Sequence, residues 1–359
     1  QALAKYHREQ FIPKNIPFIA ITGSNGKTTT KELIHEVLST TYKTYTTKGN
    51  FNNHIGIPLT ILSVKKDAEI AVIEMGANHR KEIEGYCKYT LPTHGLITNC
   101  GKAHLEGFGG EEGVKKGKGE LYDYLRNTNG TIFLFNDYDY LISMSRGIEN
   151  IKTYGTVSAE VTGIAKKGSG YLDVAITTGA DITSIHTHLI GDYNLPNVLA
   201  AVAIGKYFSV KDESIKNALE NYLPGNSRSQ LIEQGSNKII LDAYNANPSS
   251  MKAAIENFAK MTNGTKSDET NNNKILMLGA MMELGDESMA EHKGIIDLIS
   301  AYQWGAVVLV GGDFVRIKHP YLQFENATQA KEWLANQNFT NSSILVKGSR
   351  SIKMEKVIE

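Results

Sequence analysis

The sequence has few of the features that mark secreted, membrane-spanning or nucleic-acid-binding proteins. Its 359 residues include only two cysteines, Cys87 and Cys100, which are too few for a disulfide framework and lack metal-ligand spacing. No apolar run approaches the ~18 residues expected of a membrane-spanning helix, and no signal peptide is visible. Because 38 basic residues balance 38 acidic ones, no overall charge favours nucleic acid or a membrane surface. The cysteine usage predicts a reducing cytoplasm, the charge balance predicts neither nucleic acid nor a membrane as partner, and a monomer is the default.

The most informative segment that is present is a glycine-bounded loop. A short apolar run ends at Thr22, and the loop Gly23-Ser24-Asn25-Gly26-Lys27-Thr28-Thr29 leads into a helical pattern. This layout is typical of a phosphate-binding loop, in which backbone amides, a lysine and the helix N-terminus surround the phosphates and a hydroxyl reaches Mg²⁺. The strict pattern would place glycine at position 21, where this chain has Ile21. The loop is therefore a variant, and a strand-to-helix turn capped by threonine is the alternative explanation.

Strands and helices alternate over the first part of the chain. Apolar runs predict strands at 17–22, 69–76, 94–99 and 131–136, and helical patterns between them, notably at 28–40 and 111–127. This alternation predicts a doubly wound, mostly parallel α/β sheet whose site lies at the C-terminal ends of the strands. The short Gly- and Thr-rich runs of 159–190 indicate antiparallel strands attached to that sheet. The expected first domain is a P-loop domain covering residues 1–225.

A linker is predicted at 223–227, where Pro224 and Gly225 interrupt both neighbouring patterns. Beyond it the alternation restarts, which predicts a second, Rossmann-like α/β domain over residues 226–359. Its strands are expected at 238–242, 274–279, 306–310 and 343–346. Its helices are expected at 249–261, 288–302, 328–336 and 350–357. The polar, Asn-rich segment 262–273 predicts an exposed loop.

Polar residues follow several predicted strands, where a doubly wound sheet gathers its site. Glu74 could hold Mg²⁺ beside the loop, although a plain strand-end glutamate explains it equally well. His104 follows the third strand, and a polar loop residue is the simpler explanation. Asn194 and Asn197 are three residues apart and could hydrogen bond a base edge, or Asn194 could merely cap the next helix.

Two further segments carry candidate residues. The run Asp242-Ala243-Tyr244-Asn245-Ala246-Asn247-Pro248 ends the first strand predicted for the second domain, and it suits ribose or amide recognition or a capping turn. Lys118 lies in the basic stretch 113–120, whose pattern alone favours a solvated helix face. Nothing in the spacing distinguishes Lys118 from its neighbours.

In this order the motifs resemble the Mur ligases of peptidoglycan synthesis. The likeness covers nearly the whole chain, and the run from Tyr244 to Pro248 is its most specific marker. It also explains Ile21, because the family's loop has no glycine there. Folylpolyglutamate synthases share the broader fold, but these local motifs fit them less well. The segments that carry the likeness are 22–29, 74–78, 103–109, 118–120, 242–248 and 347–350.

The resemblance implies an ATP-dependent ligase that joins D-alanyl-D-alanine to UDP-N-acetylmuramoyl-tripeptide through an acyl phosphate. It implies that Lys27 and the loop amides hold the ATP phosphates and that Thr28 and Glu74 bind one Mg²⁺. It further implies that His104 and Lys118 bind a second Mg²⁺, because the family's lysine at the Lys118 position is usually carbamylated.

The likeness also assigns roles around the nucleotide. It implies that Asn194 and Asn197 lie near adenine, that Asp242 lies near the ribose and that Arg228 reaches the γ-phosphate from the linker region. Tyr244, Asn245 and Asn247 are expected in the interdomain cleft, without a defined role.

Two departures from the family pattern stand out. The family has an N-terminal domain that grips the UDP end of the substrate, whereas here the first strand begins near residue 17, so that domain is expected to be missing. Ala280 stands where relatives often have aspartate. Two alternatives therefore stay open: another ligase of the superfamily, such as a folylpolyglutamate synthase, or a nucleotide-binding module without ligation. The sequence also leaves open whether the tripeptide ends in lysine or diaminopimelate.

Overall fold

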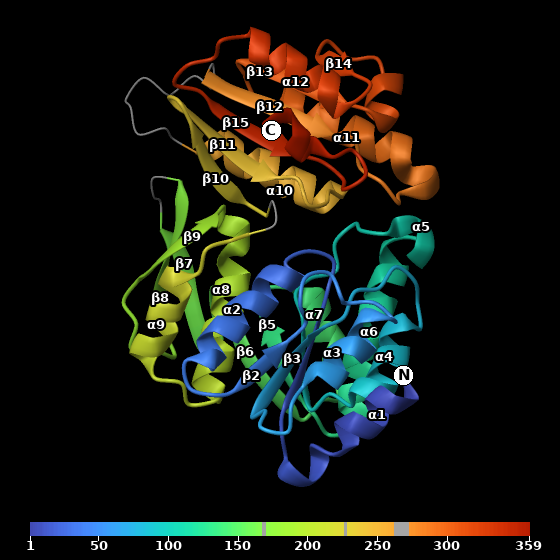
Figure 1. The fold of residues 1–359 in the computed structure, drawn as a ribbon, viewed down its shortest axis with the longest axis vertical. Coiled ribbons are helices and arrows are strands. Elements are labelled where there is room, and N and C mark those ends of the chain that lie inside the picture. Colours follow the sequence, from blue (N-terminus) through green and yellow to red (C-terminus); the bar gives the residue numbers. More distant parts are fainter. Residues whose placement is uncertain (167–169, 226–227, 262–272) are drawn as a thin grey trace.

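The computed structural model describes residues 1–166, 170–225, 228–261 and 273–359. Within these ranges the chain forms two sheets, each covered by its own helices and set one above the other in Figure 1. The exposed loop predicted at 262–273 lies outside the described residues except for Asn273, as do residues 226–227 of the predicted linker.

The first sheet has nine strands and is mostly parallel, as the alternating pattern predicts. The strands at its centre are wholly buried apolar runs, because helices cover both faces of a parallel sheet. In spatial order the strands are β2 (Thr44–Thr46), β3 (Ile70–Glu74), β1 (Phe18–Thr22), β4 (His94–Ile97), β5 (Thr131–Phe135), β6 (Asn150–Gly155), β7 (Val161–Lys166), β8 (Tyr171–Thr178) and β9 (Ile185–Ile190).

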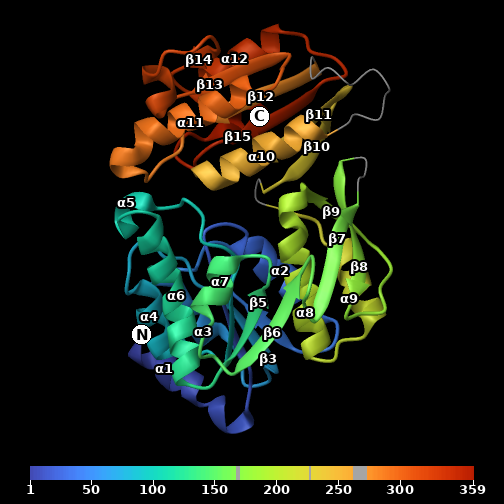
Figure 2. The same ribbon diagram turned by 180° about the vertical axis from the view of Figure 1, so that it is seen from behind.

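Helices pack on both faces of this sheet (Figures 1 and 2). One face carries α2 (Lys27–Ser39) and α8 (Leu195–Tyr207), which pack on each other and on α9 (Asp212–Asn221). The other face carries α3 (Gly56–Ser63), α4 (Glu82–Thr90) and α6 (Glu111–Asn127), and α1 (Ala2–Glu9) packs on α3 and α4. The remaining short helices are η1 (Ile12–Lys14), α5 (Leu105–Phe108), α7 (Asp139–Met144) and η2 (Asp192–Asn194).

The antiparallel portion predicted at 159–190 is present as an extension of the same sheet. β7 pairs in parallel with β6, and β8 and β9 then follow as antiparallel strands. Because β9 leads through η2 into α8, the extension delivers the start of α8 beside the glycine-bounded loop.

The second sheet has six strands and its own helices. In spatial order the strands are β10 (Gln230–Gln234), β11 (Asn237–Asp242), β15 (Ser343–Lys347), β12 (Lys274–Gly279), β13 (Ala306–Val310) and β14 (Leu322–Phe324). The helices are α10 (Pro248–Lys260), η4 (Gly285–Glu287), α11 (Ser288–Ser300), η5 (Gly312–Arg316), α12 (Ala327–Asn336) and η6 (Met354–Val357).

Two details of the second domain differ from the sequence-based expectation. Asp242 ends the second strand of this domain, because the partly exposed edge strand β10 precedes β11 and pairs with it antiparallel. The helix expected at 350–357 is only the short 3₁₀ helix η6, because Lys353 adopts a left-handed φ of 57° that interrupts helical geometry.

In the part of the chain that the structure describes, no helix is both long and apolar enough to cross a membrane.

A partly buried histidine at the start of β4 makes the stability of the first domain depend on pH. His94 packs on Phe133 and Phe208, with its ring nitrogens near the hydroxyls of Thr93 and Tyr207. Burial lowers the pKa of His94 to about 4. As the pH falls, His94 is protonated in the unfolded chain near its ordinary pKa of 6.5, before it is protonated in the folded protein. The neutral His94 therefore stabilises the fold fully above pH 6.5, and this stabilisation is lost as the pH falls toward 4. We expect a loss of about 3 kcal/mol in the free energy of unfolding through this group.

Urea unfolding at several pH values between 7 and 4 measures this loss. The His94→Gln variant should show a shallower decline than the wild type over the window, whereas His54→Gln, which changes an exposed histidine, should leave the decline unchanged. Equal declines in the wild type and His94→Gln would contradict the assignment.

Candidate active site

A cleft of about 1350 Å³ runs between the two domains. On the first domain it is lined by the glycine-bounded loop, by segments that follow β3 and β4, and by the start of α8. On the second domain it is lined by the loop after β11 and by segments that follow β12 and β15. The lining therefore comes from the C-terminal ends of strands in both sheets, which is where doubly wound folds bind ligands.

The loop between β1 and α2 needs glycine at both of its bends. Gly23 has a φ of +142°, and a Cβ at this position would lie 2.0 Å from Thr98 Oγ1. Gly26 has a φ of +80° and lies against the side chain of Asn197. Both positions are strained or closed to residues with a side chain, so the two glycines allow the loop to lie against β4 and α8.

Some of the loop amides are already used by the protein. The amide of Ser24 donates to the carbonyl of Asn99 (2.8 Å), and the amide of Asn25 donates to the Asn99 side chain (3.0 Å). α2 begins at Lys27, and the first amides of a helix have no partner within that helix. That the loop amides hold the ATP phosphates stays a prediction, and the amides at the start of α2 are the ones without a partner inside the helix.

The Lys27 ammonium folds back across the loop. Its Nζ donates to the carbonyls of Gly23 (2.8 Å) and Ser24 (3.0 Å). Burial lowers the pKa of Lys27 to about 8; nearby Glu74 opposes this effect and the nearby Arg228 adds to it. Two cations close enough to influence each other repel, so an anion placed between Lys27 and Arg228 would relieve that repulsion.

Glu74 and Thr28 meet beside the loop, as the sequence predicts. Thr28 Oγ1 donates to Glu74 Oε1 (3.1 Å), and Asn52 Nδ2 donates to the same oxygen (2.7 Å). Glu74 Oε2 is buried and has no hydrogen-bond partner among the described residues. A buried, unpaired carboxylate oxygen is costly unless a cation or donor completes it. The donor set of Glu74 and Thr28 therefore fits a Mg²⁺ ion.

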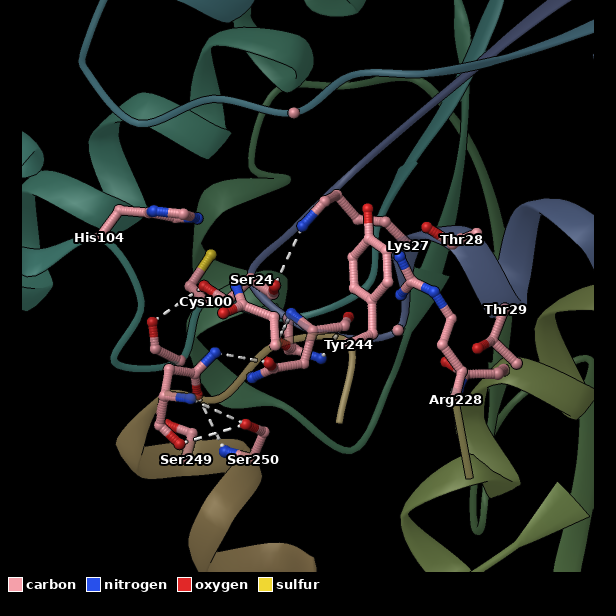
Figure 3. Close-up of a pocket in the computed structure, with 18 of the residues that line it drawn as sticks. Ser24, Lys27, Thr28, Thr29, Cys100, His104, Arg228, Tyr244, Ser249 and Ser250 are labelled. Carbon is pink, nitrogen blue, oxygen red and sulfur yellow. Dashed lines mark hydrogen bonds between the residues drawn. The ribbon is translucent and has the colours of Figure 1, made fainter. Parts of the chain in front are cut away.

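His104 lies at the left of Figure 3, away from Thr28, and it contacts the second domain through Glu283. Its Nδ1 lies 2.6 Å from Glu283 Oε2, and this pairing lowers the pKa of the Glu283 carboxyl. Among the described residues, no group of three or more His, Cys, Asp and Glu side chains is arranged to hold a metal. The second Mg²⁺ site, expected from His104 and Lys118, stays a prediction.

Lys118 is buried rather than solvated, so the helix-face explanation is wrong. Its side chain is 1% exposed, its Nζ donates to the carbonyl of Ala77 (2.8 Å), and the ammonium lies 4.8 Å from the centre of the Phe108 ring. Burial, with a contribution from Lys27, lowers the pKa of Lys118 to about 7. Since Ala77 lines the cleft, Lys118 reaches the wall of the cleft from behind.

Asn194 and Asn197 line the cleft, but their amide groups bind protein partners. Asn197 Nδ2 donates to Asn194 Oδ1 (2.8 Å), and Thr30 donates to Asn197 Oδ1 (2.9 Å). Asn194 Nδ2 donates to the carbonyl of Ile190. The two asparagines therefore connect α8 to α2, and their expected contact with a base stays a prediction.

Arg228 and Tyr244 form a stacked pair at the second-domain side of the cleft. The guanidinium carbon of Arg228 lies 3.5 Å from the centre of the Tyr244 ring, and Figure 3 shows the two side chains against each other near Lys27. Arg228 Nε is buried and has no hydrogen-bond partner among the described residues. The stack holds the guanidinium in the cleft, where it influences Lys27.

Asp242 is held by a lysine that the sequence does not single out as a site residue. Lys347 Nζ lies 2.5 Å from Asp242 Oδ2 and 3.3 Å from the carbonyl of Asn245. The lysine side chain is 2% exposed. Because Asp242 also accepts from the amide of Ser229 (3.2 Å), it is fixed on both sides at the edge of the cleft.

Direct contacts join the two domains around the cleft. Asn247 Nδ2 donates to Asn25 Oδ1 on the glycine-bounded loop (2.7 Å), and the amide of Lys102 donates to Ser249 Oγ (2.8 Å). Lys102 Nζ also pairs with Glu291 at 2.6 Å. The first domain's loop is therefore bonded to the start of α10, and the cleft is a single site built from both domains.

Sequence reasoning missed three cleft or near-cleft residues: Asn52, Glu283 and Lys347. Asn52 lies in the Asn-rich run 50–53, and nothing in the sequence around it predicts its hydrogen bond to Glu74. Glu283 and Lys347 follow the ends of predicted strands, so the strand-end rule that found Glu74 could also have found them. Ala280 is buried, and its carbonyl accepts from the amide of Ser349.

Comparison with known families and solved structures agrees with this geometry. The model of the Mur ligase middle domain matches residues 21–205, and the model of the Mur ligase glutamate ligase domain matches residues 227–350. A UDP-N-acetylmuramoyl-tripeptide–D-alanyl-D-alanine ligase from Bacillus subtilis is 34% identical, covering 100% of this chain and 78% of that protein. The Escherichia coli ligase of the same name is 33% identical, covering 99% and 78%.

Solved structures similar to this chain include a ligase of the same family. Crystal structure I of MurF from Acinetobacter baumannii is 30% identical with a TM-score of 0.88, covering 99% of this chain and 78% of that one. A folylpolyglutamate synthase from Mycobacterium tuberculosis has a TM-score of 0.69 and 12% identity, covering 99% of this chain and 94% of that one, which shows a shared fold alone. From its two matched domains and the identity of its relatives, the chain belongs to the Mur ligase family.

Proposed function

We propose that this chain is an ATP-dependent ligase that joins D-alanyl-D-alanine to UDP-N-acetylmuramoyl-tripeptide in peptidoglycan precursor synthesis. The observation that carries the proposal is the cleft in which Lys27 and Glu74 of one domain face Arg228 and Asp242 of the other. Relatives with this name match essentially the whole chain at 33–34% identity. The folylpolyglutamate alternative is supported by the fold alone.

The chemistry of the site suits activation of a carboxylate. A carboxylate is a poor acyl donor, so its oxygen first attacks the γ-phosphorus of ATP, which gives an acyl phosphate and ADP. The amine of D-alanyl-D-alanine then attacks the acyl carbon, phosphate leaves, and the amine loses a proton as the amide forms. Lys27 and Arg228 would offset the charge on the transferring phosphoryl group.

Metal ions fit part of this site. Thr28 and Glu74 would hold one Mg²⁺, which would supply positive charge to the nucleotide phosphates. For a second ion we propose His104 together with a carbamate of Lys118. The support for the carbamate is the burial of the Lys118 amine, since only the neutral amine takes up CO₂ and burial favours that form.

The remaining assignments are also proposals. We divide the chain into a central ATP-binding domain, residues 1–225, and a C-terminal domain, residues 226–359, since each segment carries one sheet. Asn194, Asn197, Asp242 and Asn245 would surround the nucleoside, since all four line the cleft. A monomer in the cytoplasm, without nucleic acid or membrane partners, suits substrates that are small, soluble nucleotides and dipeptides.

The test is ADP release with purified components. We expect turnover that requires both UDP-N-acetylmuramoyl-tripeptide and D-alanyl-D-alanine, measured with a coupled assay, and a new amide-linked product by mass spectrometry. Lysine- and diaminopimelate-containing tripeptides are both supplied, since the third residue is open. Turnover with a folate and glutamate instead would contradict the proposal. Nucleotide binding without any acceptor-dependent turnover would favour the nucleotide-binding module.

A further inference from the structure

We propose that Arg350 binds the terminal carboxylate of the acceptor dipeptide and so selects acceptors that end in a free acid. This inference rests on the proposed function, because it names the residue that recognises the acceptor in that reaction. Arg350 lines the cleft from the loop after β15, and its side chain is 67% exposed.

The positive charges that line the described cleft leave one group without an assigned anion. Lys27 and Arg228 both line the cleft at the phosphate-binding loop, and Arg228 helps to lower the pKa of Lys27. The Lys347 ammonium is 2% exposed and paired with Asp242, so its charge is already matched. Among the histidines of the lining, His104 is paired with Glu283, and none of them carries the permanent charge of an arginine. Arg350 is therefore the permanent cation that remains for a substrate anion.

The position of Arg350 matches the length of the acceptor. Both arginines lie close to the Tyr244 ring, whose centre is 3.5 Å from the guanidinium carbon of Arg228 and 5.9 Å from that of Arg350. An extended dipeptide spans about 7 Å. If Arg228 holds the transferring phosphate, the amine attacks next to it, and the far carboxylate of a dipeptide then falls within reach of Arg350.

The guanidinium of Arg350 has no close ion pair that a substrate carboxylate would have to break. Its ion pair with Glu355 is loose, with Nη1 3.6 Å from Oε1. An arginine can bind a carboxylate through two parallel N–H···O bonds, which are stronger and more specific than a single contact. Glu355 is not part of the described cleft lining, so a substrate carboxylate in the cleft would replace a loose contact and not a close ion pair.

The experiment compares two acceptors in two proteins. The acceptors are D-alanyl-D-alanine and D-alanyl-D-alaninamide, which lacks the terminal charge. We expect the wild type to prefer the free acid by about 10- to 100-fold in kcat/KM, the range that a charge-assisted hydrogen bond gives. Arg350→Met should remove that preference by weakening the acid alone, and Arg350→Lys should restore part of it. The KM for ATP should change by less than about twofold in both variants, because the loss of a charge-assisted hydrogen bond to ATP would change it more than that.

Arg316→Met is the matched control. Arg316 belongs to the same domain, is 71% exposed and pairs with Asp313, but it is not part of the described cleft lining. Equal losses for both acceptors in Arg350→Met, or a raised KM for ATP, would overturn the inference. So would a wild type that ligates both acceptors equally well, which is a result that no misfolded variant can affect. A wild type that ligates neither would overturn the proposed function as well.

Discussion

Replacing Lys118 with alanine should lower the rate of ligation by at least about 1,000-fold, with nucleotide binding largely kept. A loss of this size corresponds to about 4 kcal/mol of transition-state stabilisation, which is reasonable for a metal ligand beside a transferring phosphoryl group. The side chain is buried and donates to the carbonyl of Ala77, which lines the cleft. Lys118 would therefore act on the reaction through a metal ion at the cleft wall.

Two readouts separate this role from a structural one. The variant Lys118→Met keeps the volume of the buried stem, so it should lose activity while the melting temperature changes little. In the wild type, ¹³C-bicarbonate should give a carbamate signal by NMR that is absent from the variant. A short carboxylic acid should restore part of the activity of Lys118→Ala, whereas bicarbonate should not.

Lys116 provides the matched control because it lies two residues away on α6 and is exposed. Lys116→Ala should ligate at the rate of the wild type. Activity of Lys118→Ala close to that of the wild type would remove the carbamate from the mechanism, whatever the NMR spectrum shows.

The contiguous part of the site could be predicted from the sequence. The loop from Gly23 to Thr29 carries its own chemistry, and the apolar run before it and the helical pattern after it supply the context. Glu74 could be placed because a strand ends there, and parallel strands bring such ends together. The hydrogen bond of 3.1 Å between Thr28 Oγ1 and Glu74 Oε1 follows from the strand order β3-β1-β4, in which the strands that precede these two residues are neighbours.

Pairings between distant segments could not be predicted from pattern. Lys347 and Asp242 lie 105 residues apart, and they meet because β15 and β11 are neighbours in a sheet whose strand order the sequence does not reveal. The pairing of His104 with Glu283 depends in addition on how the two domains meet. The pattern of 350–357 predicts a helix, but the left-handed conformation of Lys353 leaves only the short η6 after it. The spacing of apolar residues does not indicate where a single residue adopts such a conformation.

Replacing Arg228 with methionine should lower kcat by about 100- to 1,000-fold, since arginines that stabilise a transferring phosphoryl group contribute at this scale or above. Affinity for ADP should change little, because ADP lacks the γ-phosphate that Arg228 is proposed to meet. Affinity for a non-hydrolysable ATP analogue, measured by calorimetry, should fall. Arg316→Met again serves as the control, and equal weakening of ADP and the ATP analogue would contradict a contact with the γ-phosphate.

Tyr244 tests whether the stack itself positions Arg228. The guanidinium carbon lies 3.5 Å from the ring centre, and the arginine's Nε is buried without a hydrogen-bond partner among the described residues, so the aromatic face is its principal support. Tyr244→Phe keeps that face and should keep kcat within about threefold, whereas Tyr244→Leu removes it and should lower kcat by about tenfold or more, the value of a desolvated cation–π contact. In the background of Arg228→Met, the change from tyrosine to leucine should have little further effect, because the group that the ring supports is already gone. Additive losses in that double variant would instead assign Tyr244 a role of its own at the substrate.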